Sequence, residues 1–120
     1  MIVYASRTGN NRYIVSKLGL PNVEITEGLL VGSPFFLLTY TDGLGTVPLK
    51  VEDFMKRNFH NCKGIIASGN SNFGVNNFCG CADKLKDKYY ISIIRKVELR
   101  GFNHDYEHIV NEYNKMIKGE

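Results

Sequence analysis

Three short apolar runs of this chain are each followed directly by a loop of hydroxyl, amide and glycine residues. No other feature constrains the fold as strongly. The runs cover residues 2–5, 35–40 and 64–68. The loops read Ser6-Arg7-Thr8-Gly9-Asn10-Asn11, Thr41-Asp42-Gly43-Leu44-Gly45-Thr46 and Ser68-Gly69-Asn70-Ser71-Asn72-Phe73-Gly74. In an open parallel sheet such loops collect at the carboxyl ends of neighbouring strands, where ligands bind. The sequence therefore predicts one composite site built from three separate segments.

Strand-like and helix-like segments alternate along the chain. Further strands are expected at residues 23–25 and 93–99, the latter with an alternation that favours the edge of a sheet. Helical spacing is found at residues 11–18, 46–57 and 77–86, and in a final segment with an apolar stripe from Tyr106 to Ile117. Pro48 suits a first helical turn, because the N–H that proline lacks has no intrahelical partner there.

This alternation predicts an α/β fold, a doubly wound five-stranded parallel sheet with helices on both faces. Right-handed crossovers leave few topologies. We expect the strand order 2-1-3-4-5, which places a crevice between the first and third strands. At 120 residues the chain is expected to form a single domain, residues 1–120.

Composition and charge argue against several classes of function. Lys and Arg number 15 against 12 Asp and Glu, and no stretch clusters basic residues, so we expect no nucleic-acid partner. No apolar run is long enough to span a bilayer, and the start Met1-Ile2-Val3-Tyr4 lacks the basic region of a signal peptide. We therefore expect no membrane partner and a cytoplasmic location.

The cysteines and histidines do not indicate a metal site. Cys62, Cys79 and Cys81 are expected to be reduced thiols, since their number is odd and no leader is found. For Cys79 and Cys81, packing near the site is the favoured interpretation and a redox role is the alternative. His104 and His108 are one helical turn apart but lack a third ligand, so a solvated helix face is expected.

The first loop suits a phosphate monoester. Ser6, Thr8 and Asn10 supply hydrogen-bonding side chains around Gly9, where a helix begins and its N–H groups favour an anion. Arg7 either assists or points to solvent. The chain has neither the Gly-Lys-Ser/Thr of a P-loop nor a GxGxxG fingerprint. The alternative interpretation is an ordinary strand–helix turn with a Ser or Thr cap.

The other two loops suit a flat ring. Gly43 and Gly45 let the backbone approach a planar ligand, and the alternative is a flexible turn. Phe73 can stack on a ring, or can instead anchor its loop in the core. Asn70 and Asn72 have the alternative of bonding the backbone of their own turn. A phosphate cradle, a glycine-rich wall and an aromatic platform together match the needs of flavin mononucleotide (FMN).

A resemblance to a known family supports this interpretation. Ser-x-Thr-Gly-Asn after the first strand is similar to flavodoxins, and residues 39–48, 67–74 and 96–101 resemble NrdI, the flavodoxin-like accessory protein family of class Ib ribonucleotide reductase. The resemblance implies a flavodoxin-like fold with one non-covalent FMN. It implies a redox accessory protein rather than a stand-alone enzyme, whose reduced flavin reacts with dioxygen. The oxidant, superoxide, then serves to assemble the dimanganese–tyrosyl radical cofactor of the reductase small subunit, and the reductant of the flavin is an unidentified partner.

The resemblance also assigns roles to residues. It places the Gly43–Leu44 peptide near flavin N5, as the group that takes part in the chemistry, and Phe73 against the ring. Ser71 departs from the family, in which a larger residue such as arginine often stands. The residues expected to bind FMN are Ser6, Arg7, Thr8, Gly9, Asn10, Asn11, Thr41, Asp42, Gly43, Leu44, Gly45, Gly69, Asn70, Phe73 and Gly74.

Two alternatives to this function remain open on the sequence. A conventional small flavodoxin would bind the same cofactor but carry electrons to another reductase. A flavin-free regulatory module of the receiver type would need carboxylates at strand ends, where this chain has Ala5, Tyr40 and Ser68. Only Asp42 is acidic in the second and third loops, which favours the anionic, fully reduced state of a bound flavin.

Overall fold

The computed structural model describes residues 1–74 and 77–119, apart from the side chain of Phe73. Five parallel strands form one sheet in the order β2-β1-β3-β4-β5, which confirms the predicted topology. The strands are β1 (Ile2–Tyr4), β2 (Asn22–Glu24), β3 (Phe35–Tyr40), β4 (Cys62–Gly69) and β5 (Ile93–Glu98). The helices are α1 (Asn10–Leu18), α2 (Leu49–Asn58), α3 (Gly80–Tyr89) and α4 (Asn103–Ile117), with short 3-10 turns η1 (Phe59–Asn61) and η2 (Ser71–Phe73).

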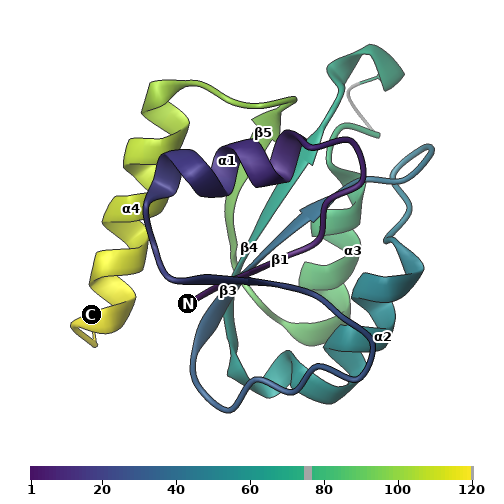
Figure 1. Cartoon of the computed structure of the whole chain (residues 1–120). Helices are drawn as coiled ribbons and strands as arrows, with labels where there is room; N and C mark the ends of the chain where they lie inside the picture. The colour runs from purple at the N-terminus through teal and green to yellow at the C-terminus, as the bar shows by residue number, and fades with distance from the viewer. Residues whose placement is uncertain (75–76, 120) are drawn as a thin grey trace.

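Helices cover both faces of the sheet, α1 and α4 on one side and α2 and α3 on the other (Figure 1). Successive side chains of a strand point to opposite faces. Leu37 therefore packs in the core under α2 and α3, whereas its neighbour Leu38 packs in the core under α1 and α4. Residues 35–39 of β3 are all buried for this reason. Apolar and polar residues do not alternate along them, as expected of a central strand covered on both faces.

Two helix starts differ from the sequence prediction. α3 begins at Gly80 instead of near residue 77, because the N–H groups of Asn77 and Phe78 both bond to the carbonyl of Gly74 in a turn. Pro48 has extended backbone and precedes α2 as its N-cap, so it is not part of the first turn. The edge position of β5 is as predicted. Among the described residues, no helix combines the length and the hydropathy of a membrane-spanning segment.

Candidate functional site

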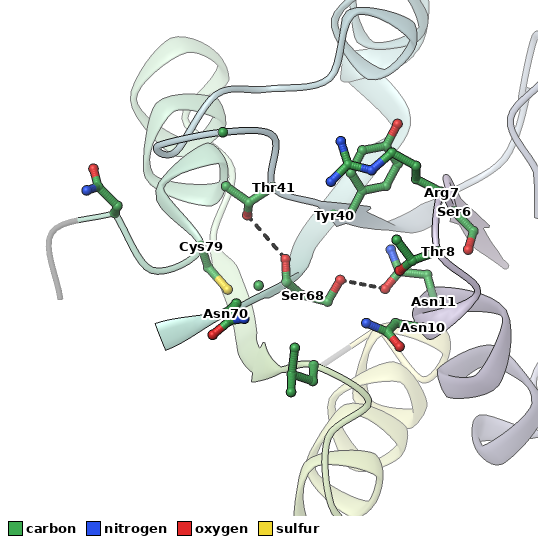
Figure 2. Close-up of a pocket in the computed structure, with 14 residues that line it drawn as sticks. Ser6, Arg7, Thr8, Asn10, Asn11, Tyr40, Thr41, Ser68, Asn70 and Cys79 are labelled. Atoms are coloured by element: carbon green, nitrogen blue, oxygen red, sulfur yellow. Dashed lines mark hydrogen bonds between the residues drawn. The ribbon is translucent and has the colours of Figure 1, made fainter. Parts of the chain in front are cut away.

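The loops after β1, β3 and β4 meet around a pocket of about 210 Å³ (Figure 2). It lies at the carboxyl ends of these strands, at the switch point between β1 and β3 where the sequence predicts a crevice. The residues that line it are Ser6, Arg7, Thr8, Asn10, Asn11, Tyr40, Thr41, Gly43, Ser68, Gly69, Asn70, Asn77, Cys79 and Leu99. Pockets that enclose whole drug-sized ligands are typically ~300–1,000 Å³, so a nucleotide here would be enclosed only in part.

The first loop presents uncapped hydrogen-bond donors to the pocket. Gly9 is the N-cap of α1, with φ 91°, and no side chain caps the helix. The alternative of a Ser or Thr cap is therefore wrong, and the first N–H groups of α1 are left for another partner. Ser6 is 8% exposed, and its Oγ is buried without a hydrogen-bond partner in the described part of the chain. Such a buried hydroxyl is rare unless a ligand or water completes it.

Asn11 ties the first loop to β4 through its side chain. Its Nδ2 donates to the Ala5 carbonyl at 2.8 Å, and Ser68 Oγ donates to its Oδ1 at 2.7 Å (Figure 2). Asn11 is 1% exposed, so both bonds are shielded from water. Although Asn11 lines the pocket, its amide is already engaged in holding the loops together.

Arg7 lines the pocket with a largely exposed side chain, and it pairs with an acidic residue of the second loop. Its Nη1 lies 2.5 Å from Asp42 Oδ1, and its guanidinium carbon lies 5.1 Å from the centroid of the Tyr40 ring. Lys50 Nζ is 5.5 Å from the same centroid and donates to the Ser6 carbonyl at 3.4 Å. Burial raises the pKa of Tyr40, the Asp42 charge adds to this effect and the Arg7 charge opposes it.

The second loop is closed by a backbone bridge and packs against α3. The N–H of Asp42 bonds to the Thr46 carbonyl at 2.9 Å, and the N–H of Thr46 bonds to the Asp42 carbonyl at 2.7 Å. At Gly45, with φ 94°, an added Cβ would lie 3.5 Å from Gly80 Cα, so the two backbones are in close contact. Thr41 Oγ1 donates to the Ser68 carbonyl at 3.2 Å and lies 3.1 Å from Cys81 Sγ.

The predicted Gly43–Leu44 peptide stands at the edge of the pocket. Gly43 lines the pocket with φ 48°, in the left-handed region that favours glycine. Leu44 is not among the lining residues and its side chain is 65% exposed. A group that binds in the pocket would therefore meet the Gly43–Leu44 peptide through Gly43 and not through the Leu44 side chain.

The third loop is held by its own turn and by β5. Asn70 Oδ1 accepts from the N–H of Asn72 at 2.9 Å, which is the turn bond considered as an alternative. Ser71 donates to Glu98 through its N–H at 3.0 Å and its Oγ at 2.9 Å, so its small side chain has a partner on the neighbouring strand. The prediction for the Phe73 ring falls outside the described residues. Gly74 ends η2 with φ 96° and is absent from the lining residues.

The end of β5 is a fourth contributor that the sequence prediction omitted. Leu99 lines the pocket, and its N–H bonds to the Gly69 carbonyl at 2.8 Å. Glu98 places a second acidic side chain near the site, beside the third loop. The composition of the second and third loops had indicated only one, Asp42. The rule applied to the first three loops, that carboxyl ends of parallel strands share one edge, also holds for β5. Two further lining residues, Tyr40 and Asn77, were not predicted, whereas Ser68 belongs to the predicted third loop and Cys79 was expected to pack near the site.

The three cysteines are buried, free thiols. Cys79 Sγ donates to the Ala67 carbonyl at 3.3 Å, and burial raises the pKa of this thiol to about 12. Burial likewise raises the pKa of Cys62 to about 11 and that of Cys81. The thiols are thus protonated at neutral pH and weak nucleophiles, which favours the packing interpretation. Across residues 1–74 and 77–119, no three His, Cys, Asp or Glu side chains form a group that could hold a metal ion.

The donors present fit a phosphate ester that carries a flat ring. Uncapped N–H groups, the unpartnered Ser6 hydroxyl and Thr8 lie at the α1 end of the pocket. Gly43 and Gly69 are among the residues that line the rest, and a Cβ at Gly69 would lie 3.0 Å from Cys79 Sγ, so a larger residue there would need the Cys79 side chain to shift. The pocket thus combines an anion-binding end with a wall that a planar group can approach closely.

Comparisons with known proteins point to one family. A family model described as "NrdI Flavodoxin like" matches residues 2–111. The chain is 36% identical over 117 residues to Protein NrdI of Bacillus licheniformis, covering 97% of this chain and 88% of that protein. It is 32% identical over 121 residues to the SPbeta prophage-derived protein NrdI of Bacillus subtilis, covering 98% and 93%. A solved flavodoxin structure of Streptococcus pneumonia TIGR4 shares the flavodoxin-like fold, with a TM-score of 0.70 at 24% identity over 99% of this chain and 97% of that one.

Proposed function

The chain belongs to the NrdI flavodoxin-like family, and we propose that it is an FMN-binding redox accessory protein of class Ib ribonucleotide reductase. In this proposal the reduced protein uses dioxygen to supply superoxide to the reductase small subunit. The superoxide serves to assemble the dimanganese–tyrosyl radical cofactor of that subunit. The partners are then the small subunit, dioxygen and a reductant, and FMN is the cofactor.

The buried Ser6 Oγ is the observation that carries the FMN proposal. It is a hydroxyl without a partner in the described chain, and it belongs to a residue that lines the pocket close to the uncapped N-terminus of α1. A phosphate oxygen at this end would accept from Ser6, from Thr8 and from the N–H groups of the first turn of α1. An unmet donor in a pocket that already has the flavodoxin-like form supports a phosphorylated ligand over a flavin-free module.

The chain's own residues would hold the ring and leave one edge accessible. Backbone at Gly43 and Gly69 would lie along the ring, and the left-handed conformation at Gly43 gives this peptide freedom that other residues lack. Bound FMN, once reduced, supplies the electrons that convert dioxygen to superoxide. The exposed side chains of Leu44 (65%) and Leu99 (45%) stand beside the pocket and would give a docked protein apolar contacts.

A reconstitution experiment tests this function. The protein is loaded with FMN, reduced with dithionite without oxygen, freed of excess dithionite and mixed with the small subunit loaded with Mn²⁺. Air is then admitted and the tyrosyl radical is measured by electron paramagnetic resonance. We expect radical formation that depends on this protein. In a second arrangement, in which the reduced protein meets air before the small subunit is added, superoxide dismutase should suppress the radical.

The controls separate this role from that of a general electron carrier. The same amount of reduced free FMN, and of a reduced conventional flavodoxin, should yield little radical. Equal yields from all three would contradict the accessory role and favour the electron-carrier alternative. Failure of the protein to bind FMN would contradict the proposal at its first step.

A further inference from the structure

Arg100 stands outside the three loops, yet its side chain reaches the first of them. It follows β5, and its Nε donates a hydrogen bond to Asn10 Oδ1 at 3.2 Å. Its guanidinium carbon lies 4.9 Å from the centroid of the Tyr13 ring, which is one turn further along α1. The guanidinium thus has two contacts with α1, a hydrogen bond and a ring face.

The backbone around Arg100 is closely specified. Leu99 and Gly101, on either side of it, have φ of 51° and 75°. The hydroxyl of Tyr106 donates to the Arg100 carbonyl, and a Cβ added at Gly101 would lie 2.6 Å from Val97 Cγ1. The chain therefore turns in one particular way here, and this turn directs the Arg100 side chain toward the start of α1.

The hydrogen bond to Arg100 determines which end of the Asn10 amide faces the pocket. A primary amide has one acceptor end and one donor end, and its orientation follows from its partners. Because Oδ1 accepts from Arg100, Nδ2 takes the other side. In Figure 2 the amide nitrogen of Asn10 lies nearer Ser68, at the pocket, and the oxygen lies on the far side.

We propose that Arg100 is a positioning residue that orients Asn10 as a donor to a phosphate group, and so lets the chain distinguish FMN from a flavin without phosphate. This inference rests on the proposed function. Of the other side chains in the first loop that line the pocket, none combines a free positive charge with a hydrogen bond to Asn10. Arg7 is paired with Asp42, and Ser6 and Thr8 are neutral. In the described part of the chain Arg100 has no carboxylate partner, so its charge remains to polarise the Asn10 donor.

Affinities for two flavins measure this effect. The dissociation constants of FMN and of riboflavin, which lacks the phosphate, are measured by fluorescence quenching for the unsubstituted protein and for Arg100→Met, Asn10→Ala and the double variant. We expect Arg100→Met to weaken FMN binding about five- to tenfold, the size of effect expected for the net loss of one ordinary hydrogen bond. Riboflavin binding should change less than twofold. In the Asn10→Ala background, Arg100→Met should change FMN affinity less than twofold, because its effect acts through Asn10.

Two further variants serve as controls. Arg12→Met removes an arginine from α1 that pairs with Glu24 and does not line the pocket, so FMN affinity should stay within twofold. Arg100→Lys keeps the charge but lacks the planar group that contacts both Asn10 and Tyr13, and it should fall between the unsubstituted protein and Arg100→Met.

Several results would overturn the inference. They are an equal loss of FMN and riboflavin affinity in Arg100→Met, no loss of FMN affinity at all, or the same loss with and without Asn10. If the unsubstituted protein binds FMN tightly while one of these results is found, the positioning role fails and the proposed function stands. If the unsubstituted protein binds no flavin, the proposed function itself fails.

Discussion

Arg7 and Asp42, 35 positions apart in the chain, form an ion pair with 2.5 Å between Nη1 and Oδ1, and so join the first and second loops at the pocket. Their side chains are 58% and 33% exposed, and pairs at such exposure contribute little to stability. Their effect on the pocket is electrostatic instead. Two opposite charges cancel each other beside a site proposed to hold a cofactor that becomes an anion when fully reduced.

Breaking this pair should shift the flavin potential in opposite directions. Arg7→Met leaves Asp42 uncompensated, which disfavours the anionic reduced flavin and should lower the potential. Asp42→Asn leaves Arg7 uncompensated and should raise it, each by on the order of tens of millivolts at low salt. The bridge to Thr46 uses only the backbone of Asp42 and is retained.

The double variant of Arg7 and Asp42 serves as the control for charge. Because it removes one charge of each sign, its potential should lie close to that of the unsubstituted protein. Potentials are measured by reductive titration with a reference dye, at low and at high salt. Shifts of the same sign in both single variants, or shifts that do not shrink with salt, would contradict the electrostatic account.

Ser6→Ala should weaken FMN binding while leaving the ligand-free fold intact. The Ser6 hydroxyl has no partner in the described chain, so its removal takes away nothing that the ligand-free protein uses. We expect an FMN dissociation constant roughly ten- to a hundredfold higher, since a hydrogen bond to a charged group contributes about 1.5–3 kcal/mol. The free energy of unfolding without FMN, from urea titration, should be unchanged or slightly higher.

Ser16→Ala is a matched control for Ser6→Ala. Ser16 is an exposed residue of α1 whose hydroxyl donates to the Tyr13 carbonyl at 2.6 Å, away from the pocket. Its FMN affinity should equal that of the unsubstituted protein. A Ser6→Ala protein that binds FMN as tightly as the Ser16→Ala protein would remove Ser6 from the phosphate site.

Gly43→Val should disturb the second loop for conformational reasons and not for lack of space. A Cβ at Gly43 would meet no atom within 4 Å, but its φ of 48° disfavours a β-branched residue by about 1–2 kcal/mol. The flavin potentials of Gly43→Val should therefore change. Gly43→Asn should change the flavin potentials less, because asparagine tolerates the left-handed region. Potentials that are the same for glycine, asparagine and valine would exclude a role for this peptide.

The buried thiols should make the protein less stable in alkali. The pKa of Cys79 is raised from 9.0 to about 12, so the folded state keeps a proton that the unfolded state loses. The contribution of this thiol to the free energy of unfolding is complete below pH 9. It is lost as the pH rises from 9 toward 12, with a slope of about 1.4 kcal/mol per pH unit. The free energy of unfolding, measured by urea titration at pH 8 to 11, should fall less steeply with pH for Cys79→Ala than for the unsubstituted protein. Equal slopes would mean that Cys79 is not shielded in the folded state.

Most of the fold follows from local pattern. The buried run at residues 35–40 indicated a central strand, the alternation of strands and helices indicated a parallel sheet, and the rule of right-handed crossovers limited its strand order. The gathering of three loops at one edge is a consequence of parallel strands, and the structure confirms it for the loops that contain Ser6, Gly43 and Gly69. The start of α3 was misplaced, because a turn through Gly74 competes with helix and leaves no trace in the apolar spacing.

The contacts that complete the site are long-range and specific to side chains. The pair Arg7–Asp42 joins two loops, Ser71–Glu98 joins a loop to the edge strand, and Arg100 reaches Asn10 over 90 positions. Periodicity carries no information on such pairs, since they depend on how the loops turn after the strands end. The contribution of Leu99 is different, because the rule for parallel strand ends would have predicted it if applied to β5.

The visible absorption spectrum of the protein mixed with FMN and freed of unbound flavin tests the central claim directly. We expect one FMN for each chain, with the shifted absorption bands of a flavin ring in contact with protein, and about tenfold or greater preference for FMN over riboflavin because the phosphate is bound. A folded protein that emerges colourless after incubation with excess FMN would contradict the account.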